Sequence, residues 1–89
     1  MAIDQGLFGF VKRSKYRKVV LKSLLDGPKV QAEIMKVTGM YRSHVTRTLH
    51  QLERKGLVQC INPDNISGKI YELNTQNVFG QGQLMQLLI

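Results

Sequence analysis

Apolar residues recur at three- and four-residue spacing in three successive segments of this 89-residue chain. Such spacing places the side chains on one face of an α-helix, so each segment is predicted to be an amphipathic helix. The apolar faces consist of Tyr16, Val20, Leu21, Leu24 and Leu25 in the first segment, Val30, Ile34 and Val37 in the second, and Val45, Leu49 and Leu52 in the third. We expect these three faces to meet in a common core.

Residues with strong conformational preferences mark the ends of the predicted helices. Ser14 precedes the first helix, where its hydroxyl can cap a backbone N–H, and Gly27-Pro28 is expected to end that helix. Gly39 suits the left-handed conformation that ends the second helix, and Gly56 ends the third. The tight turn after Gly39 is predicted to place Met40 in the core.

The chain after the third helix is typical of two strands joined by a loop. Residues 57–61 and 69–73 are rich in Val, Ile, Leu and Tyr, and residues 62–68 are rich in turn formers. Cys60 alternates with Val58 and is predicted to be a small buried residue. Two helices around a glycine turn, followed by a hairpin, predict a winged helix-turn-helix. The expected fold class is therefore mainly α with a small β-hairpin.

The length of the chain predicts one domain with appended ends. We assign residues 1–13 to an apolar N-terminal arm, 14–74 to the winged helix and 75–89 to an apolar, uncharged C-terminal tail. Because exposed apolar sets of this size favour association, a homodimer formed through both ends is predicted; folding of the tail onto its own domain is the alternative. The residues concerned are Leu7, Phe8 and Phe10 in the arm and Val78, Phe79, Leu84, Met85, Leu87 and Leu88 in the tail.

The charge of the chain favours an anionic partner. Thirteen Lys and Arg against six Asp and Glu give a formal net charge of +7, for which nucleic acid is the commonest explanation and solubility the alternative. The basic residues gather at the first helix (Lys12, Arg13, Lys15, Arg17, Lys18 and Lys22) and on the third (Arg42, Arg47, Arg54 and Lys55). This distribution favours double-stranded DNA.

Polar residues occupy the face of the third helix opposite its apolar stripe. They are Ser43, Arg47, His50 and Arg54, flanked by Thr46 and Gln51. Arg47 is the strongest candidate for a base contact, because a guanidinium can donate two hydrogen bonds to guanine; a phosphate contact or pairing with Glu53 is the alternative. Phosphate contacts or a solvated position are expected for Arg42, Arg54, Lys15 and Lys18. Ser43 and Thr46 can reach either bases or phosphates.

Three stretches resemble small archaeal winged-helix transcriptional regulators of the ArsR/MarR-like group. They are FVKRSKYRKVVLKSLLDGPK (Phe10 to Lys29), SHVTRTLHQLERKGLVQCINP (Ser43 to Pro63) and GKIYEL (Gly68 to Leu73). The resemblance implies binding of operator DNA by a homodimer, with one recognition helix, about residues 42–55, in each major-groove half-site.

The resemblance also implies roles for individual residues. Ser43, Thr46 and Arg47 match recognition-helix positions, and Lys69 matches a position in the wing. Residues 62–68 contain no Arg or Lys, so Lys69 at the base of the wing is its only expected source of positive charge. An arginine at the wing tip that enters the minor groove is therefore not expected.

Other classes of function are disfavoured by the composition. His44, His50 and Cys60 are too few and too poorly spaced for a structural zinc site, and no catalytic motif stands out, so we expect neither an enzyme nor a cofactor. A single cysteine, an N-terminus unlike a signal peptide and no apolar run of about 20 residues predict a cytoplasmic protein without a membrane span. The sequence identifies no effector.

Two functions of different classes fit these features. The favoured one is sequence-specific regulation of transcription through double-stranded DNA. The alternative is a winged helix that serves as a protein-interaction module within a larger assembly, since fold alone does not fix function. The basic solvent face of the third helix favours DNA.

Overall fold

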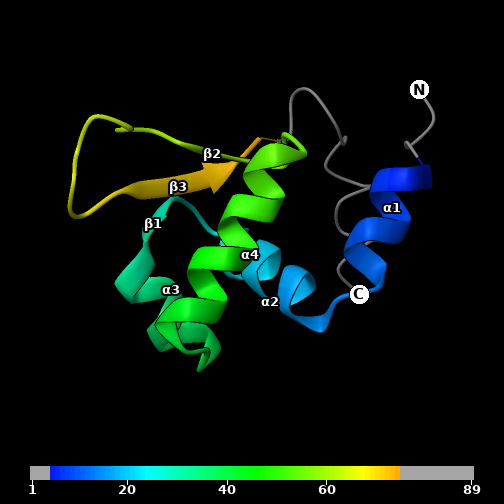
Figure 1. Ribbon diagram of the computed structural model, residues 1–89. Coiled ribbons are helices and arrows are strands. Elements are labelled where there is room, and N and C mark those ends of the chain that lie inside the picture. Colours follow the sequence, from blue (N-terminus) through cyan, green and yellow to red (C-terminus); the bar gives the residue numbers. More distant parts are fainter. Residues whose placement is uncertain (1–4, 75–89) are drawn as a thin grey trace.

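The computed structural model describes residues 5–74, except for the side chains of residues 5, 7 and 8, as four helices and three short strands (Figure 1). In chain order the elements are α1 (Gln5–Lys12), α2 (Lys15–Ser23), β1 (Lys29–Val30), α3 (Gln31–Thr38), α4 (Arg42–Arg54), β2 (Val58–Cys60) and β3 (Ile70–Leu73). The chain is thus mixed, with helices and a small antiparallel sheet, and its element order is compatible with a winged helix.

The predicted hairpin is present and is extended by a third strand. β3 is central in a sheet of order β1-β3-β2, and both pairings are antiparallel. Val58 lies opposite Leu73 on one side of β3, and Lys29 lies opposite Tyr71 on the other. β1 was not expected, because a two-residue strand has no periodicity of its own and is defined by its partner about forty residues later in the chain. It holds the start of α3 against the sheet.

The predicted helix ends are correct except at the end of α2. The Ser14 hydroxyl accepts a hydrogen bond from the Arg17 N–H at 3.3 Å, as a capping residue does. α2 nevertheless ends at Ser23, before Gly27-Pro28, because the chain turns over residues 24–26. Gly39 closes α3 in the left-handed conformation with φ 74°, and its N–H donates to the Met35 carbonyl at 2.8 Å.

The core lies between α2, α3, α4 and one face of the sheet. Its buried apolar residues are Val11, Val20, Leu21, Leu24, Ile34, Met40, Val45, Leu49, Leu52, Leu57, Val58 and Tyr71. The predicted burial of Met40 and of the α4 stripe is confirmed. Cys60 is half-buried and packs against this core, and Val11 brings the last turn of α1 into it.

Three residues of the predicted apolar stripes are exposed instead. Tyr16 is 44% exposed, Leu25 is 38% exposed and Val37 is 58% exposed. Leu25 follows the end of α2 and so leaves the helical face to which it was assigned. α3 has only two turns, and Ile34 is its one buried residue. Val37 therefore lies outside the surface with which α3 packs against the neighbouring helices. Tyr16 packs against a histidine at the surface.

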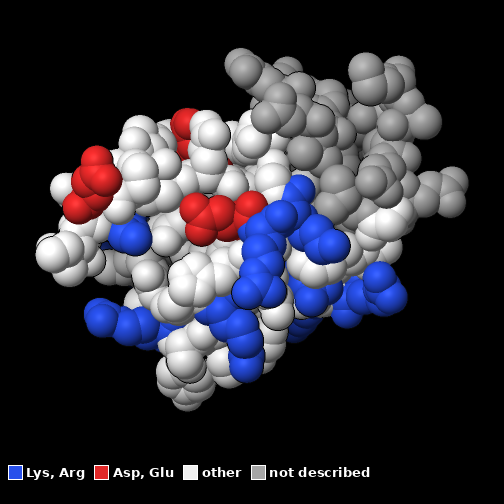
Figure 2. Space-filling view, turned by 45° about the horizontal axis from the view of Figure 1, so that its top comes forward, with Lys and Arg blue, Asp and Glu red and all other residues white. Residues whose placement is uncertain are grey.

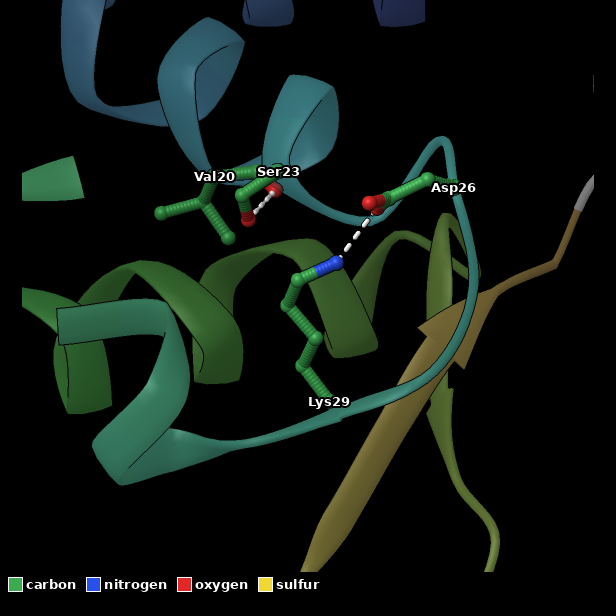
Figure 3. A network of polar contacts seen from close by, with 4 residues as sticks. All are labelled: Val20, Ser23, Asp26 and Lys29. Carbon is green, nitrogen blue, oxygen red and sulfur yellow. Dashed lines mark hydrogen bonds and ion pairs between the residues drawn. The ribbon is translucent and has the colours of Figure 1, made fainter. Parts of the chain in front are cut away.

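A buried lysine joins β1 to the end of α2 (Figure 3). Lys29 is only 8% exposed, and its ammonium group forms an ion pair with Asp26 just past the C-terminal end of α2. Beside it the Ser23 hydroxyl donates to the Val20 carbonyl at 2.6 Å. A positive charge at this end of a helix is favoured by the helix dipole.

The ion pair also affects the acid behaviour of Asp26. The hydrogen bond from Lys29 is the main cause that lowers the pKa of the Asp26 carboxyl from its usual value near 3.8. Because the folded state holds this carboxyl in its ionised form, the pair stabilises the fold above that pH. The contribution is lost as the pH falls through the lowered pKa.

Candidate nucleic-acid interface

The exposed face of α4 forms a shallow groove that brings together most of the residues predicted to contact DNA. Its lining consists of Arg42, Ser43, Thr46, Arg47, His50, Gln51 and Arg54. The arginines, Ser43 and His50 are exposed, whereas Thr46 and Gln51 are half-buried at its two edges. The groove follows one side of the helix over its whole length.

The burial pattern of α4 explains why these residues share a face. Val45, Thr48, Leu49 and Leu52 are buried against α2, α3 and the sheet. At about 100° per residue, their mean direction is opposite that of the groove. The groove therefore faces solvent because the other side of the same helix is fully used in the core.

One edge of the groove is closed by a side chain from α3. The Gln31 amide nitrogen donates to the Thr46 hydroxyl oxygen and lies 3.5 Å from the Arg42 carbonyl oxygen. Gln31 was not predicted to take part in the site. No pattern in the sequence marks it, because its partner lies fifteen residues away on another helix.

The other edge is held by Arg17, which the sequence placed in the basic group of the first helix. Its Nε donates to the Gln51 side-chain oxygen at 3.3 Å, and one terminal nitrogen donates to the Phe10 carbonyl at 2.6 Å. Its guanidinium carbon lies 3.7 Å from the centre of the Phe10 ring, and the Lys55 ammonium lies 5.4 Å from it. Arg17 thus joins α1, α2 and α4, and its charge is used inside the domain.

Two of the three predicted lysines lie near the N-terminal end of the groove, and the third does not. Lys15 is exposed and lines a second depression at the N-terminal end of α4, together with Tyr41 and His44. Lys69 is exposed and shares a third depression with Arg42 and Gln31 at the base of the loop between β2 and β3. Lys18 is half-buried on α2 and lines none of these three depressions.

An aromatic cluster occupies the depression at the N-terminal end of α4. The rings of Tyr16 and His44 have their centres 5.1 Å apart, and those of Tyr41 and His44 are 6.0 Å apart. Tyr16 was predicted to be a core residue, whereas here it covers His44 at the surface. Tyr71, by contrast, is buried in the core, and desolvation raises the pKa of its phenol.

The loop between β2 and β3, residues 61–69, presents a different surface. Asp64 is exposed in it and Ile66 is fully exposed, while Lys69 lies at its base. Figure 2 shows most Lys and Arg side chains of the visible face in its lower half and the acidic side chains above them. Positive charge therefore follows the helices rather than the loop tip.

Two other kinds of site, a metal site and a membrane span, are absent from residues 5–74. No group of three or more His, Cys, Asp or Glu residues in this range could hold a metal ion. No helix in the same range is long and apolar enough to cross a bilayer. The Cys60 thiol lies 3.5 Å from the Asn62 side-chain oxygen, to which it donates.

The chain matches no protein-family model and no curated protein sequence. The candidate interface rests on the helix geometry and on the chemistry of the residues that line the groove.

We expect Arg17→Met to lower the free energy of unfolding by about 1–3 kcal/mol, because it removes two hydrogen bonds and a cation–π contact that join three helices. Urea unfolding followed by circular dichroism measures the change. Arg13→Met is the matched control, since Arg13 is exposed just past the end of α1 and, within residues 5–74, its side chain donates only to the Gly9 carbonyl of that helix. Equal losses in both variants would contradict the role of Arg17.

Proposed function

We propose that the protein is a sequence-specific, double-stranded DNA-binding transcriptional regulator with a winged helix-turn-helix. The observation that carries the proposal is the exposed face of α4, a thirteen-residue helix whose opposite side is buried and whose groove is lined by three arginines. A helix of this kind fits the major groove, where side chains reach the base edges. α3 and the turn at Gly39 supply the first half of the helix-turn-helix.

The positions of the three arginines along α4 support different roles for them. Arg42 and Arg54 begin and end the helix and are about 18 Å apart along its axis at 1.5 Å per residue. A B-DNA major groove is about 12 Å wide, so the two ends can reach phosphates on its sides. Arg47 lies between them and is the residue for a bidentate contact to guanine. Ser43 and His50 share its exposed face.

The loop between β2 and β3 would act through its base. Lys69 shares a depression with Arg42, so both can approach the same stretch of phosphate backbone. The tip, with exposed Asp64 and Ile66, offers no positive charge to the minor groove. Lys15 extends the positive surface past the N-terminal end of α4, whereas Lys18 is less accessible.

A homodimer remains part of the proposal. Two recognition helices one DNA turn apart, about 34–36 Å, would read a palindromic site with greater discrimination than one helix. Phe10 is half-buried under Arg17 and is therefore used within its own chain. The side chains of Leu7 and Phe8 and the whole tail, with Val78, Phe79, Leu84, Met85, Leu87 and Leu88, lie outside the described residues.

Deletion of residues 78–89 should yield a folded monomer that binds palindromic DNA much more weakly than the intact chain. The physical reason is the loss of the second recognition helix from each complex. Sedimentation at micromolar concentration measures the oligomeric state of both proteins. An intact chain that sediments as a monomer would contradict the dimer. It would not contradict the proposed role of α4, which DNA-binding measurements test separately.

The alternative function is a winged helix that serves as a protein-interaction module. A groove between α2 and α3 favours it, because half-buried Val19 and exposed Leu25 and Val37 line it without any residue of α4. Lys22 and Lys29 line the same groove. A module of this kind would not need the arginines of α4, so the two functions predict different effects of replacing them.

Binding to random-sequence duplex should weaken steeply as salt rises, because each phosphate neutralised releases counterions. Replacing Arg42 and Arg54 together with Ala should weaken all duplexes alike. It should also flatten the slope of log affinity against log salt by about 1.8, or 0.9 for each phosphate contact. Fluorescence anisotropy over a salt series measures the slope.

Lys36→Ala is the control for this experiment, since exposed Lys36 on α3 lines none of the depressions around α4. Binding that hardly changes between low and physiological salt would contradict the proposal that the partner is DNA.

Arg47→Ala should cost about 1–3 kcal/mol on the preferred site and relax the preference at one base pair. Arg47→Lys is the matched control, because lysine keeps the charge and loses the planar fork that contacts guanine in two places. Affinities for specific and random duplexes, measured with all three proteins, test the assignment. Equal losses on both kinds of duplex would make Arg47 a phosphate contact.

A further inference from the structure

A third group, the Arg42 carbonyl, determines which residue donates in the hydrogen bond between Gln31 and Thr46. The Gln31 nitrogen lies 3.5 Å from the Arg42 carbonyl oxygen as well as within hydrogen-bond distance of the Thr46 hydroxyl. A carbonyl oxygen only accepts hydrogen bonds, so the amide group must turn its NH2 end, not its oxygen, toward both partners. Gln31 is therefore the donor, and the Thr46 oxygen is the acceptor.

Because the Thr46 oxygen accepts from Gln31, the Thr46 hydroxyl proton is left to be donated to another group. A threonine within a helix commonly donates to the carbonyl four residues earlier, as Thr38 does to Ile34 at 2.6 Å. For Thr46 that carbonyl belongs to Arg42, which the Gln31 amide already approaches. Within residues 5–74 no acceptor is found for the Thr46 proton, and Thr46 lines the groove on α4.

We propose that Gln31 is a specificity-determining residue that makes Thr46 a hydrogen-bond donor toward the DNA. This inference rests on the proposed function. In the major groove, guanine O6 and N7, thymine O4 and adenine N7 are acceptors, whereas cytosine N4 and adenine N6 are donors. A Thr46 hydroxyl whose proton is free while its oxygen already accepts from Gln31 favours a base that offers an acceptor, because that proton is otherwise left unpaired in a desolvated interface. Gln31 acts through Thr46 and is a positioning residue.

Gln31→Glu tests the inference by reversing the direction of the hydrogen bond. A carboxylate only accepts, so the Thr46 hydroxyl donates its hydrogen bond to residue 31 and its oxygen is left to accept from the DNA. The base preference at the position facing Thr46 should shift from acceptors toward cytosine N4 or adenine N6. Residue 31 is the first of α3, where a negative charge is favoured by the helix dipole, so the variant is expected to fold.

Three further variants distinguish the effect of the hydrogen-bond direction from the effect of the added charge and from the effect of losing the hydrogen bond. Thr46→Val keeps the side-chain shape and removes the hydroxyl. The base pair at which this variant loses its preference is the one that faces Thr46. Gln31→Met removes the donor without adding charge and should relax that preference without reversing it. Gln31→Glu combined with Thr46→Val carries the new charge without the hydroxyl, and it should weaken all duplexes alike.

The measurement is the affinity of each protein for four duplexes that differ only at that base pair, after selection of the preferred site from a random library. A reversal of preference of about tenfold is expected for Gln31→Glu, within the range for one base contact. Unchanged preference in Gln31→Glu, or no effect of Thr46→Val at any position, would overturn the inference alone. A wild-type protein that selects no sequence would overturn the proposed function, and with it this inference.

Discussion

Burial of one side of α4 is the constraint on which the rest of the structure depends. Val45, Leu49 and Leu52 are almost completely excluded from solvent, and they contact elements from both halves of the chain. Rotation of this helix by even a part of a turn would expose them, at a cost of about 1.5–3 kcal/mol for each side chain. The direction of the polar face is thus fixed by the core, before any partner is bound.

Side chains at the two edges of that face refine its position. Arg17 on one side and Gln31 on the other each hydrogen-bond to a half-buried residue of α4. The edges differ chemically, because a charged guanidinium holds Gln51 while a neutral amide holds Thr46. The side chains of Gln51 and Thr46 are consequently restrained in the free protein, and side chains held in place beforehand lose less entropy when a partner binds.

The sequence was informative where a local pattern decides the structure. The stripe of α4, the cap at Ser14 and the left-handed Gly39 depend on residues within one or two turns, and all three were predicted. The strand β1 and the hydrogen bonds of Arg17 and Gln31 to α4 were not predicted. Each depends on a partner that is remote in the chain. Exposed Leu25 and Val37 show the limit of periodicity in short helices: a stripe extends only as far as a neighbouring element covers it.

Not all of the thirteen Lys and Arg side chains are available at the surface to contact a partner. Lys29 of β1 is buried and paired with Asp26, and Arg17 is held between three helices, so neither is presented to a partner as a solvated side chain. The sequence placed Arg17 in the basic group of the first helix. Exposed Arg42, Arg47 and Arg54 line the groove on α4, and exposed Lys55 follows the end of that helix.

The small sheet has a consequence for how copies of this protein can meet. Its edge strands are β1 and β2, with two and three residues, and both flank a central strand that is already paired on each side. Long open edges invite strands of other chains to add on, whereas edges this short offer few free backbone groups. Growth of the sheet from copy to copy into ribbons or fibres is thereby discouraged, and contacts between copies are left to side chains.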